Sequence, residues 1–492
     1  MLDYLKEEAN LTYTENGALT HMTSGKSCLD LFFRAGAMRG QDERTIYECF
    51  RRAFQESPEA AMKILFFARD IRGGLGERRF FRIVMKQLTY DAPDAVERNL
   101  PYIAEYGRYD DLLPLIETHC SQSVYKLIKS QLEEDIADMK ENKSVSLLAK
   151  WLPSVNASSA ETRKLGMKIA EKLGMTNTEY RKTLSALRKH IDIIENYLRE
   201  VDYSFDYSKQ PSGAMFKYRN AFIRNDGERY GEYINLVLEG REKLNASTLY
   251  PYQIVRRIVS SRFYSNEKLT NEEKLSLDAS WKSLPDYENN ENAIAIIDGS
   301  GSMTCDCGGV SPIDVALSLG IYFAEHSTGP FADHFITFSE NPRLVEIKGN
   351  DITEKVNNCL KYNEIANTDL EAVFDLILRT AVKNKLTQDK LPAKLYIISD
   401  MEFDYCIYGG NNMTMFEAMR QKYAQYGYKL PDIVFWNVCS HGRNIPVEFS
   451  ETGAALVSGF SPVIFNMVMG EAISPEYIMN KIIFSERYEK IK

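Results

Sequence analysis

The residues best suited to bind a ligand directly follow a short apolar run in the second half of the chain. Residues 293–302 read Ala-Ile-Ala-Ile-Ile-Asp-Gly-Ser-Gly-Ser, so Asp298, Ser300 and Ser302 come immediately after the run. The run has the length and β-branched content of a buried parallel strand, and open α/β sheets place ligands at the carboxyl ends of such strands. One carboxylate and two hydroxyls are hard oxygen ligands, which suit Mg²⁺, Mn²⁺ or Ca²⁺ better than zinc.

Two segments downstream carry further polar residues of the same kind. Thr368 precedes a strongly periodic helix that begins near Leu370, and as the N-cap it has a hydroxyl free to turn toward a metal. Residues 393–400 form a second apolar run that ends in Asp400. The alternative interpretation is that serine and glycine after a strand are only turn residues, and that Asp400 only caps a helix.

The eight cysteines are scattered, which is typical of reduced thiols in a cytoplasmic protein rather than of a disulfide framework. Cys305 and Cys307 follow the first polar cluster, and Cys406 lies just beyond Asp400. Three thiols on one rim are able to hold zinc or to respond to oxidation, although the chain has no CxxC pair. We favour the alternative that these are unconnected loop cysteines.

Length and charge predict a large soluble protein of two or three domains. No apolar stretch is long enough to cross a bilayer, and the amino end is not a signal peptide, so we expect a cytoplasmic protein without a membrane partner. Residues 1–290 hold 43 basic and 43 acidic side chains, whereas residues 291–492 hold 17 and 26. The acidic second half suits a cation and repels nucleic acid, so a polyanion is expected to bind the first half.

The first half has many helix signals and few strand signals. Ser57-Pro58-Glu59 predicts the start of one helix, and the glycines of residues 73–76 predict its end. Further helices are expected over about 97–106, 110–118, 122–139, 160–173, 178–201, 226–240 and 250–261. Pairs of short helices recurring at about 40 residues indicate an α-solenoid of the HEAT type. The polar stretch 286–292 is a natural junction, which gives domains of residues 1–285 and 286–492.

The polar segments of the second half, in this order, resemble the metal-binding loops of the von Willebrand factor A domain over about residues 290–470. The resemblance implies a doubly wound, Rossmann-like α/β domain with a metal-ion-dependent adhesion site. In that family the serines and a threonine bind the cation, and an aspartate after a later strand joins through water. The implied site is Asp298, Ser300, Ser302, Thr368 and Asp400. Mg²⁺ is the implied cofactor, with Mn²⁺ or Ca²⁺ as alternatives, and a position is left for water or a partner's carboxylate.

Two stretches of the first half are similar to the TROVE module. Residues 66–78 resemble its ARD-x-R-x-G-x-GER turn, and residues 100–113 resemble its P-x-I-x-EYGRWDDL segment. TROVE modules are helical rings followed by a von Willebrand factor A domain, as in the Ro autoantigen, and they bind RNA on the outside and in a basic central hole. Residues 146–154, 180–182 and 221–230 look more like a related uncharacterised family with the same two-part plan.

Basic residues of the first half are bunched in three places beside tyrosine and phenylalanine, an arrangement able to neutralise phosphates and stack bases. The alternative is that they are solvated helix faces paired with the equally numerous acids. The candidate RNA-binding residues are Arg69, Arg72, Arg78, Arg79, Arg181, Lys182, Arg188, Arg256 and Arg257.

No catalytic triad, Walker A, HExxH or paired-carboxylate motif occurs in the sequence, so we expect a protein that is not an enzyme. The sequence favours an RNA-binding scaffold of the Ro type, whose cation site recruits a partner. The alternative is a protein–protein adaptor without an RNA role, in which the metal captures an aspartate or glutamate of the partner. A metal-dependent nuclease at Asp298 and Asp400 is disfavoured, because two-metal sites need more carboxylates.

Overall fold

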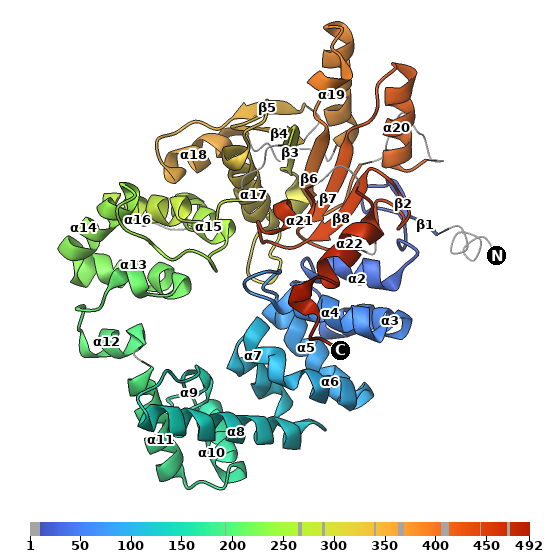
Figure 1. The fold of residues 1–492 in the computed structure, drawn as a ribbon. Coiled ribbons are helices and arrows are strands. Elements are labelled where there is room, and N and C mark those ends of the chain that lie inside the picture. The colour runs from blue at the N-terminus through green and yellow to red at the C-terminus, as the bar shows by residue number, and fades with distance from the viewer. Residues whose placement is uncertain are drawn as a thin grey trace.

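The protein consists of a mostly helical N-terminal part and a C-terminal α/β part, as the sequence predicts (Figure 1). The computed structural model describes residues 10–191, 193–263, 268–287, 291–338, 341–362, 369–404, 413–442, 444–469 and 473–492. None of the helices within these ranges is long and apolar enough to span a membrane.

The α/β part is built on a six-stranded sheet of order β5-β4-β3-β6-β7-β8. Its strands are β3 (Ala293–Asp298), β4 (His334–Phe338), β5 (Arg343–Glu346), β6 (Lys394–Ser399), β7 (Asp432–Asn437) and β8 (Ala454–Ser458). Neighbouring strands are parallel except β4 and β5. β3 and β6 are buried along their whole length, which explains their continuous apolar sequences. The strand order reverses direction between β3 and β6, so these two strands flank the switch point of the sheet.

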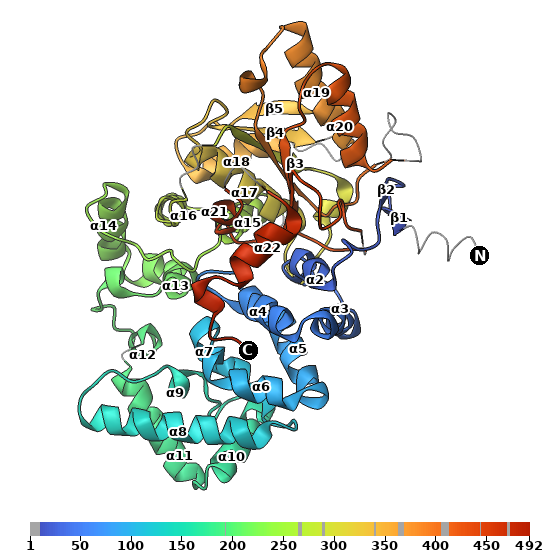
Figure 2. The same ribbon diagram turned by 45° about the vertical axis from the view of Figure 1, so that its right-hand side comes forward.

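Helices cover the sheet on its two faces (Figure 2). They are α17 (Pro312–His326), α18 (Ile352–Cys359), α19 (Leu370–Lys383), α20 (Met415–Gln425), α21 (Ile464–Met467) and α22 (Pro475–Ile483). The close packing of α17 on β3 depends on Gly320, where an added Cβ would lie 2.0 Å from Ile297 Cδ1. This packing fixes the strand that carries the first polar cluster.

The N-terminal part forms an arc of short helices. They are α2 (Ser27–Ala35), α3 (Glu43–Glu56), α4 (Pro58–Arg69), α5 (Arg78–Asp91), α6 (Pro93–Asn99), α7 (Ile103–Tyr106), α8 (Ser121–Lys140), α9 (Leu148–Trp151), α10 (Ala160–Lys172), α11 (Asn177–His190), α12 (Ile194–Glu200), α13 (Ser212–Asn225), α14 (Gly227–Leu238), α15 (Pro251–Phe263) and α16 (Asn271–Lys282). The predicted cap of α4 is present, because Ser57 Oγ accepts the Ala60 amide at 3.3 Å.

The helix boundaries differ from the sequence prediction at several places. The expected helix over 178–201 is two helices, α11 and α12. The expected helix over 110–118 is a 3₁₀ segment, Tyr109–Leu115, with Pro114 inside it, and proline has no amide hydrogen for a regular α-helical bond. α2, α3, α13 and α16 were not predicted.

The first described residues lie against the α/β part, although the sequence places them in the helical domain. β1 (Leu11–Tyr13) and β2 (Leu19–His21) form a hairpin, and the His21 amide donates to the Ile445 carbonyl at 3.1 Å. α2 packs on β8, where Ser458 Oγ donates to the Phe32 carbonyl at 3.1 Å. The start of the chain therefore belongs in space to the second half.

The arc is closed by contacts at both of its ends (Figure 1). At one end α15 packs on α17 and α18. At the other end the C-terminal segment returns to α4, where Arg487 Nη2 and Tyr488 OH donate to the buried Asp70 carboxylate at 2.7 and 2.9 Å. The helices and the α/β part together form a ring around a central opening.

Candidate functional site

Four of the five predicted metal ligands, Asp298, Ser300, Ser302 and Asp400, follow β3 and β6 at the switch point of the sheet. Asp298 ends β3 and is fully buried. Its Oδ1 accepts the Ser300 amide at 2.9 Å, and its Oδ2 accepts the Ser399 hydroxyl at 2.6 Å. The hydroxyls of Ser300 and Ser302 lie 3.0 Å apart. The turn after β3 thus brings three of the predicted ligand residues together.

Asp400 follows the neighbouring strand β6 and is also buried. Its Oδ1 accepts the Glu402 amide at 3.2 Å. Its Oδ2 is buried and has no hydrogen-bond partner among the described residues. A buried carboxylate oxygen without a donor is costly unless a cation or water compensates it, so the residues present fit the implied divalent cation.

The second loop of the predicted site is described only in part. Thr368 lies outside the described residues, and so does Cys406. The predicted N-cap of the following helix is wrong, because Asp369 Oδ1, and not Thr368, accepts the Ala372 amide at 2.9 Å. Asp369 is the better cap because its carboxylate accepts from the amide three residues later and favours the positive helix end.

The Asp400 carboxylate adds to the cost of ionising the buried Asp298. Burial, and after it the neighbouring Asp400 carboxylate, raise the pKa of Asp298 to about 7. A carboxylic acid with a raised pKa destabilises the folded protein increasingly as the pH rises from its ordinary value of about 4 to 7. A divalent cation between the two carboxylates removes this cost.

We therefore expect stabilisation by Mg²⁺ to depend on pH. Above pH 7 the cation meets an ionised Asp298, whereas at lower pH it has to displace a proton, which weakens binding by up to about tenfold per pH unit. The rise in melting temperature on adding a fixed concentration of Mg²⁺ should be larger at pH 8 than at pH 5.5. Asp298→Asn should abolish the rise at both values, with K⁺ at equal ionic strength as the control. An equal rise in the variant would contradict this site.

The candidate RNA-binding residues fall into two classes in the structure. Arg69 is 2 % exposed and its guanidinium pairs with Asp111 at 2.7 Å, so the expectation of a surface contact with phosphate is wrong for Arg69. Arg188 is half-buried and donates to two backbone carbonyls and to Ser154 Oγ. Arg257 pairs with Glu273 at 2.7 Å. These three side chains hold helices together.

The remaining candidates are exposed, but they do not form one surface. They are Arg72, Arg78, Arg79, Arg181, Lys182 and Arg256. Arg181 and Lys182 lie on α11, whereas Arg78 and Arg79 begin α5. Only Arg78 and Arg79 of this exposed group line the central cavity described next.

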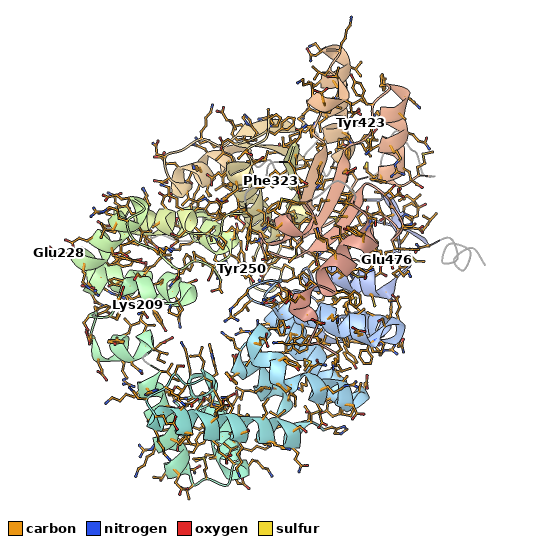
Figure 3. The ribbon with its side chains drawn as sticks, viewed as in Figure 1. Lys209, Glu228, Tyr250, Phe323, Tyr423 and Glu476 are labelled. Carbon is orange, nitrogen blue, oxygen red and sulfur yellow. The ribbon has the colours of Figure 1, made fainter. Side chains whose placement is uncertain are left out.

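A cavity of about 700 Å³ lies where the helical arc faces the α/β part. Figure 3 shows Tyr250 beside the central opening. The cavity is lined by residues of α5, α9, α12 and α13, by the turn before α15 and by Gly308 of the α/β part. The basic residues that line it besides the buried Arg69 are Arg39, Arg78, Arg79, Arg108, Lys150 and Lys217.

Three of these six cations are neutralised by carboxylates. Arg39 pairs with Glu77 at 2.7 Å, Arg108 with Asp110 at 2.8 Å and Lys150 with Glu195 at 3.2 Å. In the part of the chain that the structure describes, Arg78, Arg79 and Lys217 form no ion pair. Lys150 and Lys217 were missed by the sequence analysis, because no local pattern connects residues so far apart in the chain.

Comparisons with known proteins find two family models that match separate parts of the chain and one relative that matches nearly all of it. Residues 292–489 match the family described as "Domain of unknown function (DUF7788)", and residues 14–125 and 175–287 match "Domain of unknown function (DUF2828)". The chain is 30% identical over 498 residues to "Uncharacterized protein L728" of Acanthamoeba polyphaga mimivirus. The aligned region covers 94% of this chain and 85% of that protein.

A search of solved structures finds the Ro (RSR) protein of Deinococcus radiodurans. The match has a TM-score of 0.34 and 10% sequence identity, and it covers 94% of this chain and 93% of that chain.

Proposed function

The chain belongs to the family of mimivirus protein L728 and of the two domains of unknown function, and on the geometry of its own cavity we propose that it is a non-catalytic RNA-binding scaffold. One observation carries the proposal: a cavity of about 700 Å³ combines unneutralised cations with aromatic side chains. Single-stranded nucleic acid is recognised by this combination, because cations follow the phosphates and rings stack on the bases.

Arg78 indicates most directly that the cavity receives an anion. Partial burial, and after it the neighbouring guanidiniums of Arg108 and Arg82, lower the pKa of Arg78, and they outweigh the carboxylates of Asp110 and Asp111, which raise it. The Arg78 side chain is exposed at the cavity and forms no ion pair among the described residues, so an anion that enters the cavity can reach it. Arg79 uses Nη1 to donate to the carbonyls of Arg39 and Gln41 at 3.2 and 2.7 Å, which orients its charge without neutralising it.

Three rings on the cavity wall offer surfaces to bases: Trp151, Tyr218 and Tyr250. The Arg108 guanidinium lies 4.0 Å from the centre of the Trp151 ring, and the Lys217 ammonium lies 4.7 Å from that of Tyr218. Each pair places a stacking surface beside a cation. The Tyr250 hydroxyl is buried and has no hydrogen-bond partner among the described residues.

The cation site supports a second role for the same chain. The unpartnered Oδ2 of Asp400 and the adjacent hydroxyls of Ser300 and Ser302 offer oxygen ligands to Mg²⁺ at the edge of the sheet. A cation held there completes its shell with a carboxylate from a partner protein. If the cavity binds no RNA, this site makes the chain a protein–protein adaptor.

Fluorescence anisotropy tests the RNA proposal. Labelled single-stranded RNA, a structured RNA with a single-stranded 3′ end and a matched duplex DNA are titrated with the full chain across a salt series. We expect both RNAs to bind in preference to the duplex, with an affinity that falls steeply as salt rises, because bound phosphates release counterions. Equal binding of the duplex, or no binding at low salt, would contradict the proposal and leave the adaptor.

A further inference from the structure

Two loops of the α/β part bring two thiols and an imidazole together. Cys305 follows β3 in the turn after Ser302, and Cys439 and His441 follow β7. The sulfur atoms of the two cysteines and a ring nitrogen of His441 all lie within 4.8 Å of one another. Cys305 Sγ is 3.8 Å from His441 Nε2. The sequence suggested a possible group of thiols from Cys305, Cys307 and Cys406, but it did not connect Cys305 with Cys439 or His441.

The topology of the sheet explains why these residues meet. β3 and β7 are the two parallel neighbours of β6, so all three strands end at the same edge. The loops after β3 and β7 therefore meet over the end of β6, where Asp400 lies. Asp400 Oδ2 is 3.5 Å from His441 Nε2, and this buried oxygen has no hydrogen-bond partner among the described residues.

The loop that carries Cys439 and His441 is held in place by the N-terminal segment. The Ser440 amide donates to the Ala37 carbonyl at 3.0 Å, and Gln41 Nε2 donates to the Ser440 carbonyl at 2.6 Å. Arg34 Nη2 donates to the Gly442 carbonyl at 3.1 Å. Contacts on both sides of the loop thus fix its backbone before any ligand binds, which lowers the cost of assembling a site.

Two cysteines and one histidine form the ligand set of a zinc ion. In a tetrahedral site with Zn–S about 2.3 Å and Zn–N about 2.0 Å, the sulfur and nitrogen ligands lie about 3.6 Å apart. The separation of 3.8 Å between Cys305 Sγ and His441 Nε2 is close to that value.

We propose that Cys305, Cys439 and His441 bind a zinc ion, whose fourth position is left to water. The ion links the loop after β3 to the loop after β7 and so stabilises both loops at the switch point of the sheet. This zinc site is distinct from the proposed Mg²⁺ site, because its ligands are thiolates and an imidazole, whereas those of the Mg²⁺ site are hydroxyls and carboxylates. The two sites adjoin, because His441 Nε2 lies 3.5 Å from Asp400 Oδ2.

Metal analysis of the full chain, purified with reductant and without chelator, tests the inference. We expect about one zinc per chain in the wild type and its loss in Cys439→Ser. Cys120→Ala, which removes a buried thiol in the helical part, should keep the zinc. Because Cys439 is buried and its variant is at risk of misfolding, His441→Gln is the second variant, at a side chain that is 27% exposed.

Co²⁺ provides a readout that does not depend on any variant. Titration of the metal-free wild type with Co²⁺ should give the charge-transfer and visible bands of a tetrahedral thiolate site, and added Mg²⁺ should leave them unchanged. Zinc retained in both variants would overturn the proposal. So would the absence of both zinc and the Co²⁺ bands. None of these outcomes bears on RNA binding, so the two proposals fail separately.

Discussion

Replacing Arg78 and Lys217 together with glutamine is expected to weaken the binding of single-stranded RNA by about 100-fold. Both side chains line the central cavity and are exposed, and neither forms an ion pair within the described residues. Each charge-assisted hydrogen bond to a phosphate is worth about 1.5–3 kcal/mol, so losing two costs about 3 kcal/mol or more. The slope of log K against log salt should also become shallower by about 1.4, since two fewer counterions are released.

The matched control is Arg181→Gln with Lys182→Gln. It removes the same charge from the same helical part, at exposed positions of α11 that do not line the cavity. We expect this control to bind single-stranded RNA almost as tightly as the wild type. If instead the α11 variant loses binding and the cavity variant keeps it, the RNA contacts the outer face of α11 and the cavity proposal is wrong. Unchanged melting temperatures in both variants would show that the fold is intact.

Replacing Asp70 with asparagine is expected to lower the free energy of unfolding by about 3 kcal/mol, because it leaves part of a buried ion-pair network uncompensated. Asp70 is fully buried and accepts from Arg487 Nη2, from Tyr488 OH and from the amides of Arg72 and Gly73. Asparagine retains one acceptor oxygen but adds an amide group that donates toward Arg487. Urea denaturation measures the loss, and faster proteolysis of the C-terminal segment would report that the ring has opened there.

The contact of Asp70 with Arg487 also predicts how the difference in stability between the wild type and Asp70→Asn varies with pH. Burial alone raises the pKa of Asp70, but the hydrogen bonds from Arg487 and from two amides outweigh it and hold the pKa below its ordinary value. A lowered carboxylate pKa stabilises the fold above the ordinary value of about 4, and this stabilisation is lost as the pH falls further. The wild type and Asp70→Asn should therefore converge in stability below about pH 4.

Glu105→Gln is the matched control at the same interface. Glu105 and Lys490 are 3.4 Å apart, but their side chains are 50% and 60% exposed. Exposed pairs of this kind contribute about 0–1 kcal/mol, so this variant should unfold almost as the wild type does. A similar loss of stability in both variants would mean that the interface depends on overall charge rather than on the buried network at Asp70.

Local sequence was sufficient to predict the two-part plan and the strands of the cation site. β3 and β6 are continuous apolar runs that end in polar residues, and burial from both faces produces that pattern whatever surrounds it. Helices with a serine or threonine cap and an apolar face, such as α4 and α10, were predicted for the same reason. The split of the region 178–201 into two helices was missed.

The sequence by itself thus determined that a helical half precedes an α/β half, and that Asp298, Ser300, Ser302 and Asp400 follow strands. Only the tertiary structure decided that Arg69 is buried, that Arg78 and Lys217 face one cavity, and that Cys305, Cys439 and His441 share a site. The physical reason is the range of the interactions. Strands and caps are set within a few residues, whereas ring closure and the cavity depend on contacts such as that of Asp70 with Arg487, which join residues hundreds of positions apart.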